Sequence, residues 1–479
     1  MNGKAFGSVG AAIALAVGSA LGQQAAASAE KPVEQEGPPL FAWGGDNRTR
    51  YEFMDNWPRG NAVTTTYDEY LRFRTRVWGE LRPADELLLR VRLGNEFRSY
   101  RNSPANNSRN KFPDELYVDN LFAQWREDGW GLKVGRQEYL KGSYRILGDG
   151  TPGDGSRTIF FDAAMLTLDY GEKSTVDVFG TWNHYRDDMT VGRTATGVYD
   201  MTFMRRGDPY SKMDEGGAGV YAECREMDNL AIDLFWVWKK ETSFHGGAER
   251  FPGRDFHTVG LRLMPKFNDW LSGELEAAYQ FGRVDSQDAR DVGGAPDPET
   301  GLPRTQEAFA SRDISAGMAY AALVAKAADV AWTPSFRLAA LYMSGDKDSY
   351  YATTDGSTET GWNPVFGRLP PGGDIPIYMY DVGRWSNLFH PHAEIGVVPA
   401  KGHPVTFEAG PMYAVEKDAG AEDHYRGLYV RTVYRFPLPE FAGVKFNGLV
   451  SGDVFEYGDY FDTEEDRATS VRLELNAKF

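Results

Sequence analysis

Arginines that alternate with apolar residues are the side chains of this sequence on which chemistry could rest. Residues 70–78 read "YLRFRTRVW" and residues 89–97 read "LRVRLGNEF". A guanidinium is always charged, and its fork of N–H donors matches the two oxygens of a carboxylate. Several such groups on one face therefore predict a surface that attracts anions. The arginines on the polar faces of such segments are Arg72, Arg74, Arg76, Arg90, Arg92, Arg98, Arg262, Arg337 and Arg431.

A second interpretation of these arginines is structural. Each could pair with a carboxylate on a neighbouring segment, such as Glu80, Glu96, Glu274 or Glu276, and stiffen the wall. For any single arginine the two interpretations are evenly balanced. For the set, arginine outnumbers acid in the second and third predicted strands, which favours a net basic patch. A water-filled interior tolerates such a patch, whereas a soluble core would bury like charges without partners.

Alternation with a period of two extends over nearly the whole chain. The last residues, 471–479, read "VRLELNAKF", with Val, Leu, Leu, Ala and Phe on one side and polar residues on the other. This period is typical of a strand with one apolar and one polar face. No stretch has a comparable helical period, so the fold class is all-β. Eighteen strands are predicted, starting near residues 48, 67, 86, 116, 130, 163, 174, 216, 229, 256, 271, 314, 332, 392, 405, 424, 444 and 469.

The connections between these strands alternate between short and long. Short ones include residues 83–85 and 171–173, and long polar loops lie near residues 185–215 and 345–391. Outer-membrane barrels have short periplasmic turns and long extracellular loops, and a closed sheet leaves no edge unsatisfied in hydrocarbon. The sequence therefore predicts a transmembrane up-and-down antiparallel β-barrel in the outer membrane of a Gram-negative-type cell. The terminal Phe479 resembles the signal by which the outer-membrane assembly machinery recognises its clients.

The first residues are predicted to form a secretory signal peptide. Lys4 precedes an apolar core at residues 11–21, and residues 27–29 offer an A-x-A cleavage site. We expect residues 1–29 to be removed, residues 30–47 to form a periplasmic N-terminal segment, and residues 48–479 to form the barrel.

Composition excludes several other classes of protein. The formal net charge of −17 argues against nucleic-acid binding. No apolar run beyond the N-terminus is long enough for a spanning helix. The single Cys224 cannot form an internal disulfide, and no spacing of Cys and His predicts a metal, so no cofactor is expected. Acidic loops such as "FDTEEDR" either are simply solvated or bridge divalent cations to lipopolysaccharide, and the sequence leaves both open.

Three further motifs have a structural and a chemical interpretation. Residues 148–153 match the dinucleotide pattern G-x-G-x-x-G by letter, but Pro152 and the β context favour a glycine loop that reaches into the barrel. The loop near residues 140–162 is therefore a candidate constriction. His390 and His392 lack further metal ligands nearby, which favours a loop or interfacial role. An outer-membrane hydrolase would need a Ser and a His on neighbouring strands, and the sequence suggests no such pair.

Residues 132–170 resemble the alginate export family of outer-membrane barrels. The resemblance rests on Gly135-Arg136-Gln137, on Arg157-Thr158 before Phe161-Asp162-Ala163, and on "ELYVDNLF" (115–122) and "WNPVFGRLP" (362–370). It implies an eighteen-stranded channel with a basic constriction that carries an anionic polysaccharide outward. It also adds Arg136 and Arg157 to the candidate constriction.

The sequence thus predicts an outer-membrane channel for anionic solutes that exports an acidic, alginate-like polysaccharide. A porin for the uptake of small organic anions or oligosaccharides is the alternative, and a hydrolase is a third class. Expected partners are the anionic solute, outer-membrane lipid and lipopolysaccharide, the assembly machinery and periplasmic export proteins. The predicted pore-lining residues are Arg72, Arg74, Arg90, Arg92, Arg136, Arg157, Arg337 and Arg431.

Overall fold

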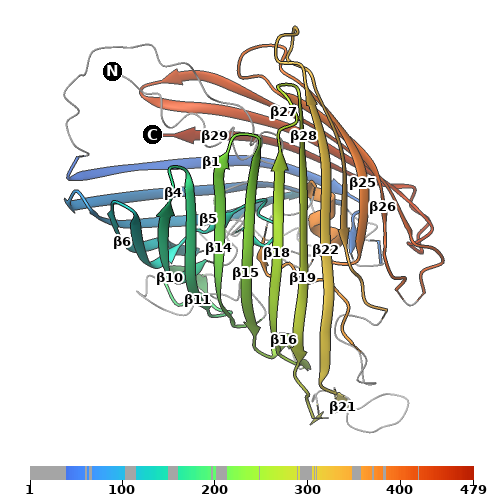
Figure 1. Ribbon diagram of the computed structural model, residues 1–479. Coiled ribbons are helices and arrows are strands. Elements are labelled where there is room, and N and C mark those ends of the chain that lie inside the picture. Colours follow the sequence, from blue (N-terminus) through green and yellow to red (C-terminus); the bar gives the residue numbers. More distant parts are fainter. Residues whose placement is uncertain are drawn as a thin grey trace.

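A closed antiparallel barrel forms the body of the protein in the computed structural model (Figure 1). The structure describes residues 39–59, 62–63, 67–102, 115–148, 160–195, 198–200, 213–246, 249–288, 290–291, 305–306, 308, 310–347, 358–368, 372–380, 385–418 and 420–479. Among these residues, no helix is long and apolar enough to cross a membrane. The predicted signal peptide and Arg157 lie outside the described residues.

Eighteen strands of the described chain pair in sequence order around the barrel, as predicted. They are β1 (Phe41–Asp55), β4 (Tyr67–Ala84), β5 (Leu87–Asn102), β6 (Glu115–Glu127), β7 (Trp130–Gln137), β10 (Phe161–Tyr170), β11 (Ser174–Asn183), β14 (Glu215–Met227), β15 (Leu230–Glu241), β18 (Arg254–Pro265), β19 (Leu271–Val284), β22 (Arg312–Lys326), β23 (Ser335–Met343), β25 (Leu388–Val397), β26 (Val405–Tyr413), β27 (Tyr425–Phe441), β28 (Val444–Tyr457) and β29 (Arg467–Lys478).

Shorter elements lie in the loops. They are β2 (Pro58–Arg59), β3 (Ala62–Val63), β8 (Leu140–Lys141), β9 (Leu147–Gly148), β12 (Thr190–Ala195), β13 (Val198–Asp200), β16 (Phe244–Gly246), β17 (Glu249–Phe251), β20 (Arg290–Asp291), β21 (Thr305–Gln306), β24 (Phe366–Gly367) and the helix α2 (Asp374–Tyr380).

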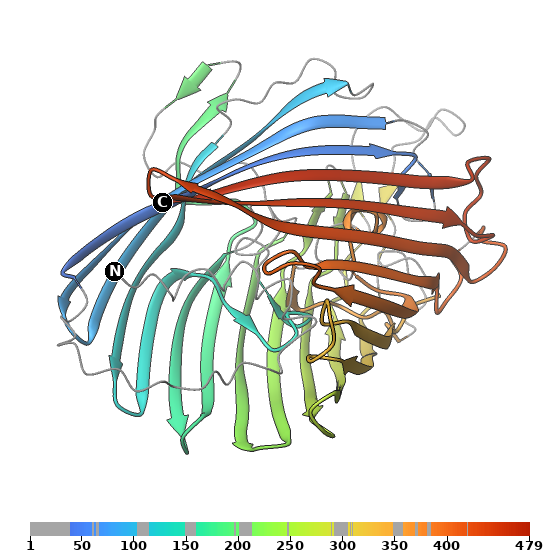
Figure 2. The ribbon, with the colours of Figure 1, turned by 90° about the horizontal axis from the view of Figure 1, so that it is seen from above.

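The first and last strands close the ring. Gly45 and Phe479 exchange both backbone hydrogen bonds, at 2.9 and 3.1 Å, and β1 also pairs with β4. This double pairing extends β1 to Phe41, so the strand begins earlier than the predicted residue 48. In Figure 2 the C-terminal end of the chain lies where the red strand β29 meets the blue strand β1.

Alternation along each strand separates an apolar exterior from a polar interior. On β4, Val77 and Leu81 are exposed, whereas Arg72, Arg74 and Arg76 on the other face are buried. The same holds around the ring, where exposed apolar residues include Leu93, Leu132, Val178, Leu234, Leu261, Leu275, Leu338, Ile395, Val450 and Leu473. A soluble protein does not expose an apolar surface of this extent. The exterior is therefore suited to contact with hydrocarbon.

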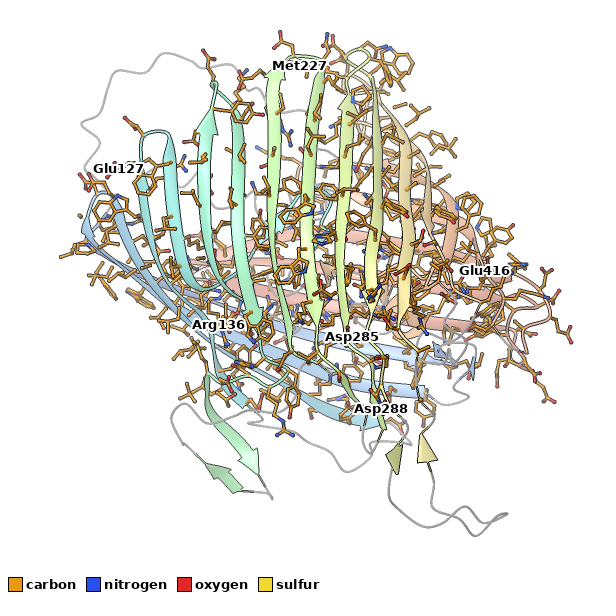
Figure 3. The ribbon with its side chains drawn as sticks, turned by 60° about the horizontal axis from the view of Figure 1, so that its bottom comes forward. Glu127, Arg136, Met227, Asp285, Asp288 and Glu416 are labelled. Carbon is orange, nitrogen blue, oxygen red and sulfur yellow. The ribbon has the colours of Figure 1, made fainter. Side chains whose placement is uncertain are left out.

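The two ends of the barrel differ. Glu127 and Met227 each precede a tight turn and lie at one end, while Asp285 and Asp288 lie at the other, where the long loops begin (Figure 3). Exposed aromatic residues mark the end with short turns: Trp43, Trp125, Trp270, Trp332, Phe441 and Phe479. Outer-membrane barrels carry such an aromatic girdle where hydrocarbon meets water.

The lipid-facing assignment predicts how an outward charge affects stability. Val259→Arg places a guanidinium in the middle of β18, on its exposed face. We expect a loss of about 2–4 kcal/mol in the free energy of unfolding in lipid, measured by urea titration. Asp228→Arg in the turn after β14 is the control and should change the stability by less than about 0.5 kcal/mol. Equal effects of the two substitutions would place this face of the barrel in water.

Candidate functional site

Two loop segments fold into the barrel and pair with each other. The inner hairpin comprises residues 138–148 and contains β8 and β9. The crossbar comprises residues 358–368 and 372–380 and contains β24 and α2. β9 pairs in parallel with β24, with Leu147 opposite Phe366. Residues 140–148, the first part of the loop near 140–162 that the sequence singled out, thus enter the barrel together with a second segment (Figure 2).

One end of the crossbar is fixed to β14 and β15. The Arg368 guanidinium donates to both carboxylate oxygens of Glu215, at 2.8 and 2.5 Å. Lys239 on β15 donates from Nζ to the carbonyl oxygen of Val365 at 2.6 Å. All three charged side chains are at least nine-tenths buried. This end of the crossbar therefore carries a positive charge that meets an acidic wall.

The other end of the crossbar is fixed to β27, β28 and β29. Arg431 donates to the Gly372 carbonyl oxygen at 2.9 Å, and the Asp374 N–H donates to the Asp453 carboxylate at 2.6 Å. The Asp374 carboxylate also accepts from the Arg472 guanidinium. In strand order, β14 and β15 lie about halfway round the ring from β28 and β29. Residues 365–368 and 372–374 of the crossbar therefore contact opposite sides of the barrel interior.

The inner hairpin is fixed by its own cations. Lys141 Nζ lies 2.9 Å from the Asp177 carboxylate, and Arg145 donates to Glu276 at 2.6 Å. The Arg145 guanidinium also lies 3.7 Å from the centre of the Tyr320 ring. Burial lowers the pKa of the Lys141 ammonium, but neighbouring carboxylates, with Asp177 foremost, outweigh it and raise that pKa above its usual value. Lys141 thus stays charged at neutral pH.

The two segments fill one side of the interior with apolar side chains. Their buried residues Ile146, Leu147, Trp362, Phe366 and Ile375 belong to one hydrophobic cluster. The inward residues of that cluster come from β10, β11, β14, β15, β18, β19, β22, β23 and β25 to β29, and within the described chain none comes from β1 or β4 to β7. The remaining side, along β1 and β4 to β7, is lined by charged groups.

We name the charged side the arginine face and define it by Arg48, Arg50, Arg72, Arg74, Arg76, Arg90 and Arg92 on β1, β4 and β5. Arg48 stands opposite Arg74 in register, and Arg50 stands opposite Arg72. Like charges directly opposite each other on neighbouring strands are destabilising. This arrangement therefore concentrates positive charge on one part of the wall.

Carboxylates offset part of this charge. Close pairs on the arginine face are Arg50–Glu474 at 2.6 Å, Arg72–Glu96 at 2.7 Å, Arg76–Asp46 at 3.0 Å, Arg90–Glu80 at 2.6 Å and Arg92–Asp119 at 2.6 Å, and Arg92 also pairs with Glu138. The inward, even-numbered positions of β4 and β5 hold seven arginines (72, 74, 76, 82, 90, 92, 98) and three carboxylates (68, 80, 96). Carboxylates from β1, β6, β29 and the inner hairpin add to these three, so that each of the seven arginines of the arginine face has a carboxylate within 4.0 Å. Arginine therefore exceeds acid on β4 and β5 themselves, while neighbouring elements supply the pairing.

Three other predicted pore-lining residues, Arg136, Arg337 and Arg431, lie on strands outside the arginine face. Arg136 on β7 (Figure 3) is 2% exposed and is held by Asp162 at 2.8 Å and Asp187 at 2.7 Å. Arg337 on β23 donates to the Tyr320 hydroxyl at 3.1 Å, and Arg431 holds the crossbar. Arg337 and Arg431 thus lie apart from Arg72, Arg74, Arg90 and Arg92, which the fold brings together.

Sequence reasoning missed several charged residues of the interior. Arg48 and Arg50 continue the arginine face onto β1, and the alternation in "RTRYEF" (48–53) is the signal that could have found them. Arg368 and Asp374, which anchor the crossbar, have no such signal, because a loop has no period that tells which residues turn inward.

The two histidines lie in a strand, and their predicted place in a loop is wrong. His390 and His392 belong to β25, where pairing with β23 sets His390 opposite Leu341. Their rings stack with centroids 4.6 Å apart inside the barrel, and His390 is 2% exposed. Among the described residues, no group of three or more metal-ligating side chains includes them.

Comparisons with known proteins identify the fold. No family model matches the chain, and no curated protein matches it. The outer membrane protein OpdK of Pseudomonas aeruginosa matches with a TM-score of 0.52 and 13% identity, over 91% of this chain and 99% of OpdK. OpdK solved with vanillate matches at 0.52 and 11%, over 91% and 98%. OccAB1 of Acinetobacter baumannii matches at 0.50 and 13%, over 92% and 97%. At these identities the similarity shows the fold, that of an outer-membrane barrel.

The resemblance to the alginate export family is wrong. The solved structures reported above, which match over more than nine-tenths of this chain, are Opd and Occ outer-membrane proteins and not alginate exporters. Residues of the motifs that suggested the resemblance are required by the local structure. Gly135 has φ +121°, and a Cβ there would lie closer than 3.0 Å to the Leu121 carbonyl oxygen. Trp362 and Phe366 of "WNPVFGRLP" are completely buried in the crossbar. The residue types at such positions are therefore set by packing inside the barrel, and they do not identify the solute that it transports.

The buried anchor of the crossbar predicts a characteristic pattern of stability. Arg368→Met leaves the Glu215 carboxylate buried without its main partner, which costs about 3–5 kcal/mol. We expect the lower end of this range, because Lys239 Nζ remains 3.5 Å from Glu215. The double substitution Arg368→Met with Glu215→Met should recover most of the loss in urea unfolding. A double variant no more stable than the single one would contradict this explanation.

Proposed function

We propose that the protein is an outer-membrane porin that takes up small organic anions. The observation that carries this proposal is the arginine face, which lies on the side of the interior that the apolar cluster does not fill. Positive groups along a wall of low dielectric attract anions and raise their local concentration. Guanidinium groups in particular offer bidentate contacts to carboxylates.

The inner segments favour a small solute over a polysaccharide. The two described stretches of the crossbar are fixed to opposite sides of the interior by buried charged groups. A pore constricted in this way suits molecules that pass one at a time between several weak contacts. Export of an acidic polysaccharide, the leading expectation from sequence, has no such support and rested on a family resemblance that is wrong.

The similar solved structures support the same proposal. OpdK, which shares this fold, has been solved with vanillate, a small organic anion. The apolar exterior and the aromatic girdle at the end with short turns are consistent with a place in the outer membrane. Identity of the solute rests on the residues of the arginine face rather than on the fold.

Neutralising the arginine face should reduce anion selectivity. Arg48 and Arg74 face each other in register, and Arg48→Gln with Arg74→Gln removes both charges. We expect the anion-to-cation permeability ratio, measured from reversal potentials in planar bilayers, to fall severalfold. Arg126→Gln with Arg283→Gln removes the same charge from exposed positions outside the arginine face and is the matched control. Equal effects of both pairs would assign selectivity to net charge alone.

Salt should weaken the preference for anions. The Debye length shrinks from about 10 Å at 0.1 M to about 3 Å at 1 M ionic strength, so that only ions in contact with the arginines still experience their field. We expect the permeability ratio of the wild-type protein to approach one as KCl rises over this range. A ratio independent of salt would indicate that selectivity arises from pore size.

A further inference from the structure

Four neighbouring strands carry charged residues that point away from the barrel interior. Each of these residues lies one position from the end of its strand, at the end of the barrel with the long loops: Lys240 on β15, Asp255 on β18, Arg283 on β19 and Asp313 on β22. The four strands lie side by side (Figure 1), and Lys240 stands opposite Asp255, which stands opposite Arg283, which in turn stands opposite Asp313. Their side chains are 43–77% exposed. We call these four residues the charged row.

Both cations of the charged row have hydrogen-bond donors to offer. Lys240 Nζ lies 4.0 Å from the Asp255 carboxylate, and Arg283 Nε lies 3.8 Å from that of Asp313. These separations are too long for hydrogen bonds, and within the described chain neither cation donates one to another group. The aspartates thus offset the charge of the row without occupying its donors. An anion outside the barrel could accept hydrogen bonds from both cations.

Aromatic side chains lie directly below the charged row on the same outer face. Trp238, His257 and Phe281 are the next outward residues of their strands, and they face each other in register. The His257 ring stacks between those of Trp236 and Phe281, with centroids 5.7 and 5.3 Å apart. Aromatic rings of this kind gather where hydrocarbon meets head groups. The charged row, one step further out, therefore lies at the level of the lipid head groups.

A groove of about 310 Å³ opens on the outer face below these aromatic residues. Its outward lining residues are Val220 and Ala222 on β14, Leu234 and Trp236 on β15, and Val259 on β18. Leu234 and Lys240 are six residues apart, which is about 20 Å along a strand that rises about 3.4 Å per residue. A lipid whose head group lies on the charged row could therefore place an acyl chain in this groove.

We propose that this face of the barrel binds lipopolysaccharide of the outer leaflet. Lys240 and Arg283 donate to phosphate groups of its lipid A head group, and the groove holds one acyl chain. Phosphate oxygens accept strong hydrogen bonds from ammonium and guanidinium groups. The long loops of an outer-membrane barrel are extracellular, and this places the charged row in the leaflet that contains lipopolysaccharide.

The spacing of the two cations favours this glycolipid over a phospholipid. Lys240 and Arg283 lie two strands apart, or about 10 Å at a strand spacing of about 4.8 Å. Each cation can therefore contact a phosphate of its own, and lipid A carries two phosphates, whereas most phospholipids carry one. The site lies on the outer face, so the inference does not depend on which solute passes through the pore.

Titration of the purified full-length protein with lipid A, followed by native mass spectrometry in detergent, tests the inference. Lys240→Gln with Arg283→Gln should lower the affinity about tenfold, as expected for the loss of two exposed charge contacts. Lipid A from which both phosphates have been removed should bind the wild-type protein as weakly as intact lipid A binds this double variant. Ala222→Phe fills the groove without any change of charge and should weaken the binding of lipid A severalfold.

Lys266→Gln with Lys326→Gln is the matched control. It removes the same charge from exposed positions next to β18 and on β22, at the end with short turns. This control should keep the wild-type affinity, and migration of the unheated protein on gels checks that every variant is folded. An equal loss of affinity in both double variants overturns the inference, because binding would then follow net charge.

Two further results would assign this face to another occupant and overturn the inference as well. One is phosphatidylglycerol, a phospholipid with a single phosphate, binding as tightly as lipid A. The other is a lipid-free dimer of the wild-type protein that the Lys240→Gln, Arg283→Gln variant fails to form, because the occupant would then be a second copy of this chain. None of these measurements involves ion conduction, so the proposed function is judged separately.

Discussion

Hydrocarbon offers no hydrogen bonds, and this single constraint determines most of the structure. Every backbone N–H and C=O of a membrane-crossing sheet must find its partner on a neighbouring strand, so the sheet has to close on itself. The pairing of β1 with β29 accomplishes this closure. The same constraint keeps the outward positions apolar, and period-2 alternation then directs every second residue into the interior. All arginines of the wall share one compartment for this reason.

Charged side chains inside the barrel must pair with one another there, and this pairing also positions the loops. The crossbar carries Arg368 in its first described stretch, residues 358–368, and Asp374 in its second, residues 372–380. Each lies where the wall presents the opposite sign, Glu215 on β14 and Arg472 on β29. Reversing the direction of the crossbar would bring like charges together in a region where they are poorly screened. The charge pattern of the wall thus fixes the orientation of a segment whose apolar side chains alone would not define it.

The strands could be predicted from the sequence, whereas the packing of the loop segments inside the barrel could not. Alternation identified each of the strands because lipid imposes it on every crossing, and it also identified Arg72, Arg74, Arg90 and Arg92 as inward residues that lie together. Loops follow no such rule. Trp362 and Phe366 suggested a family motif, but they are core residues of the crossbar. His390 and His392 suggested a loop or interfacial role because no further metal ligands lie nearby in the sequence, yet both belong to strand β25.

The fold constrains its outward residues within the hydrocarbon to be apolar, whereas its inward residues include an apolar cluster from β10 to β29 and are charged along β1, β4 and β5. Barrels at 13% identity can share the architecture because apolar residues of many kinds satisfy the outer face. Serine or glutamine would satisfy the inner face of β1 and β4 equally well. Arginines that face each other across these strands instead lower stability, as the pairs Arg48–Arg74 and Arg50–Arg72 must. Sequences that specify a fold break its local rules mainly where function requires it. The arginines that face each other on β1 and β4 are such a place, where wall carboxylates such as Glu96 and Glu474 offset the repulsion and the proposed anion would add to them.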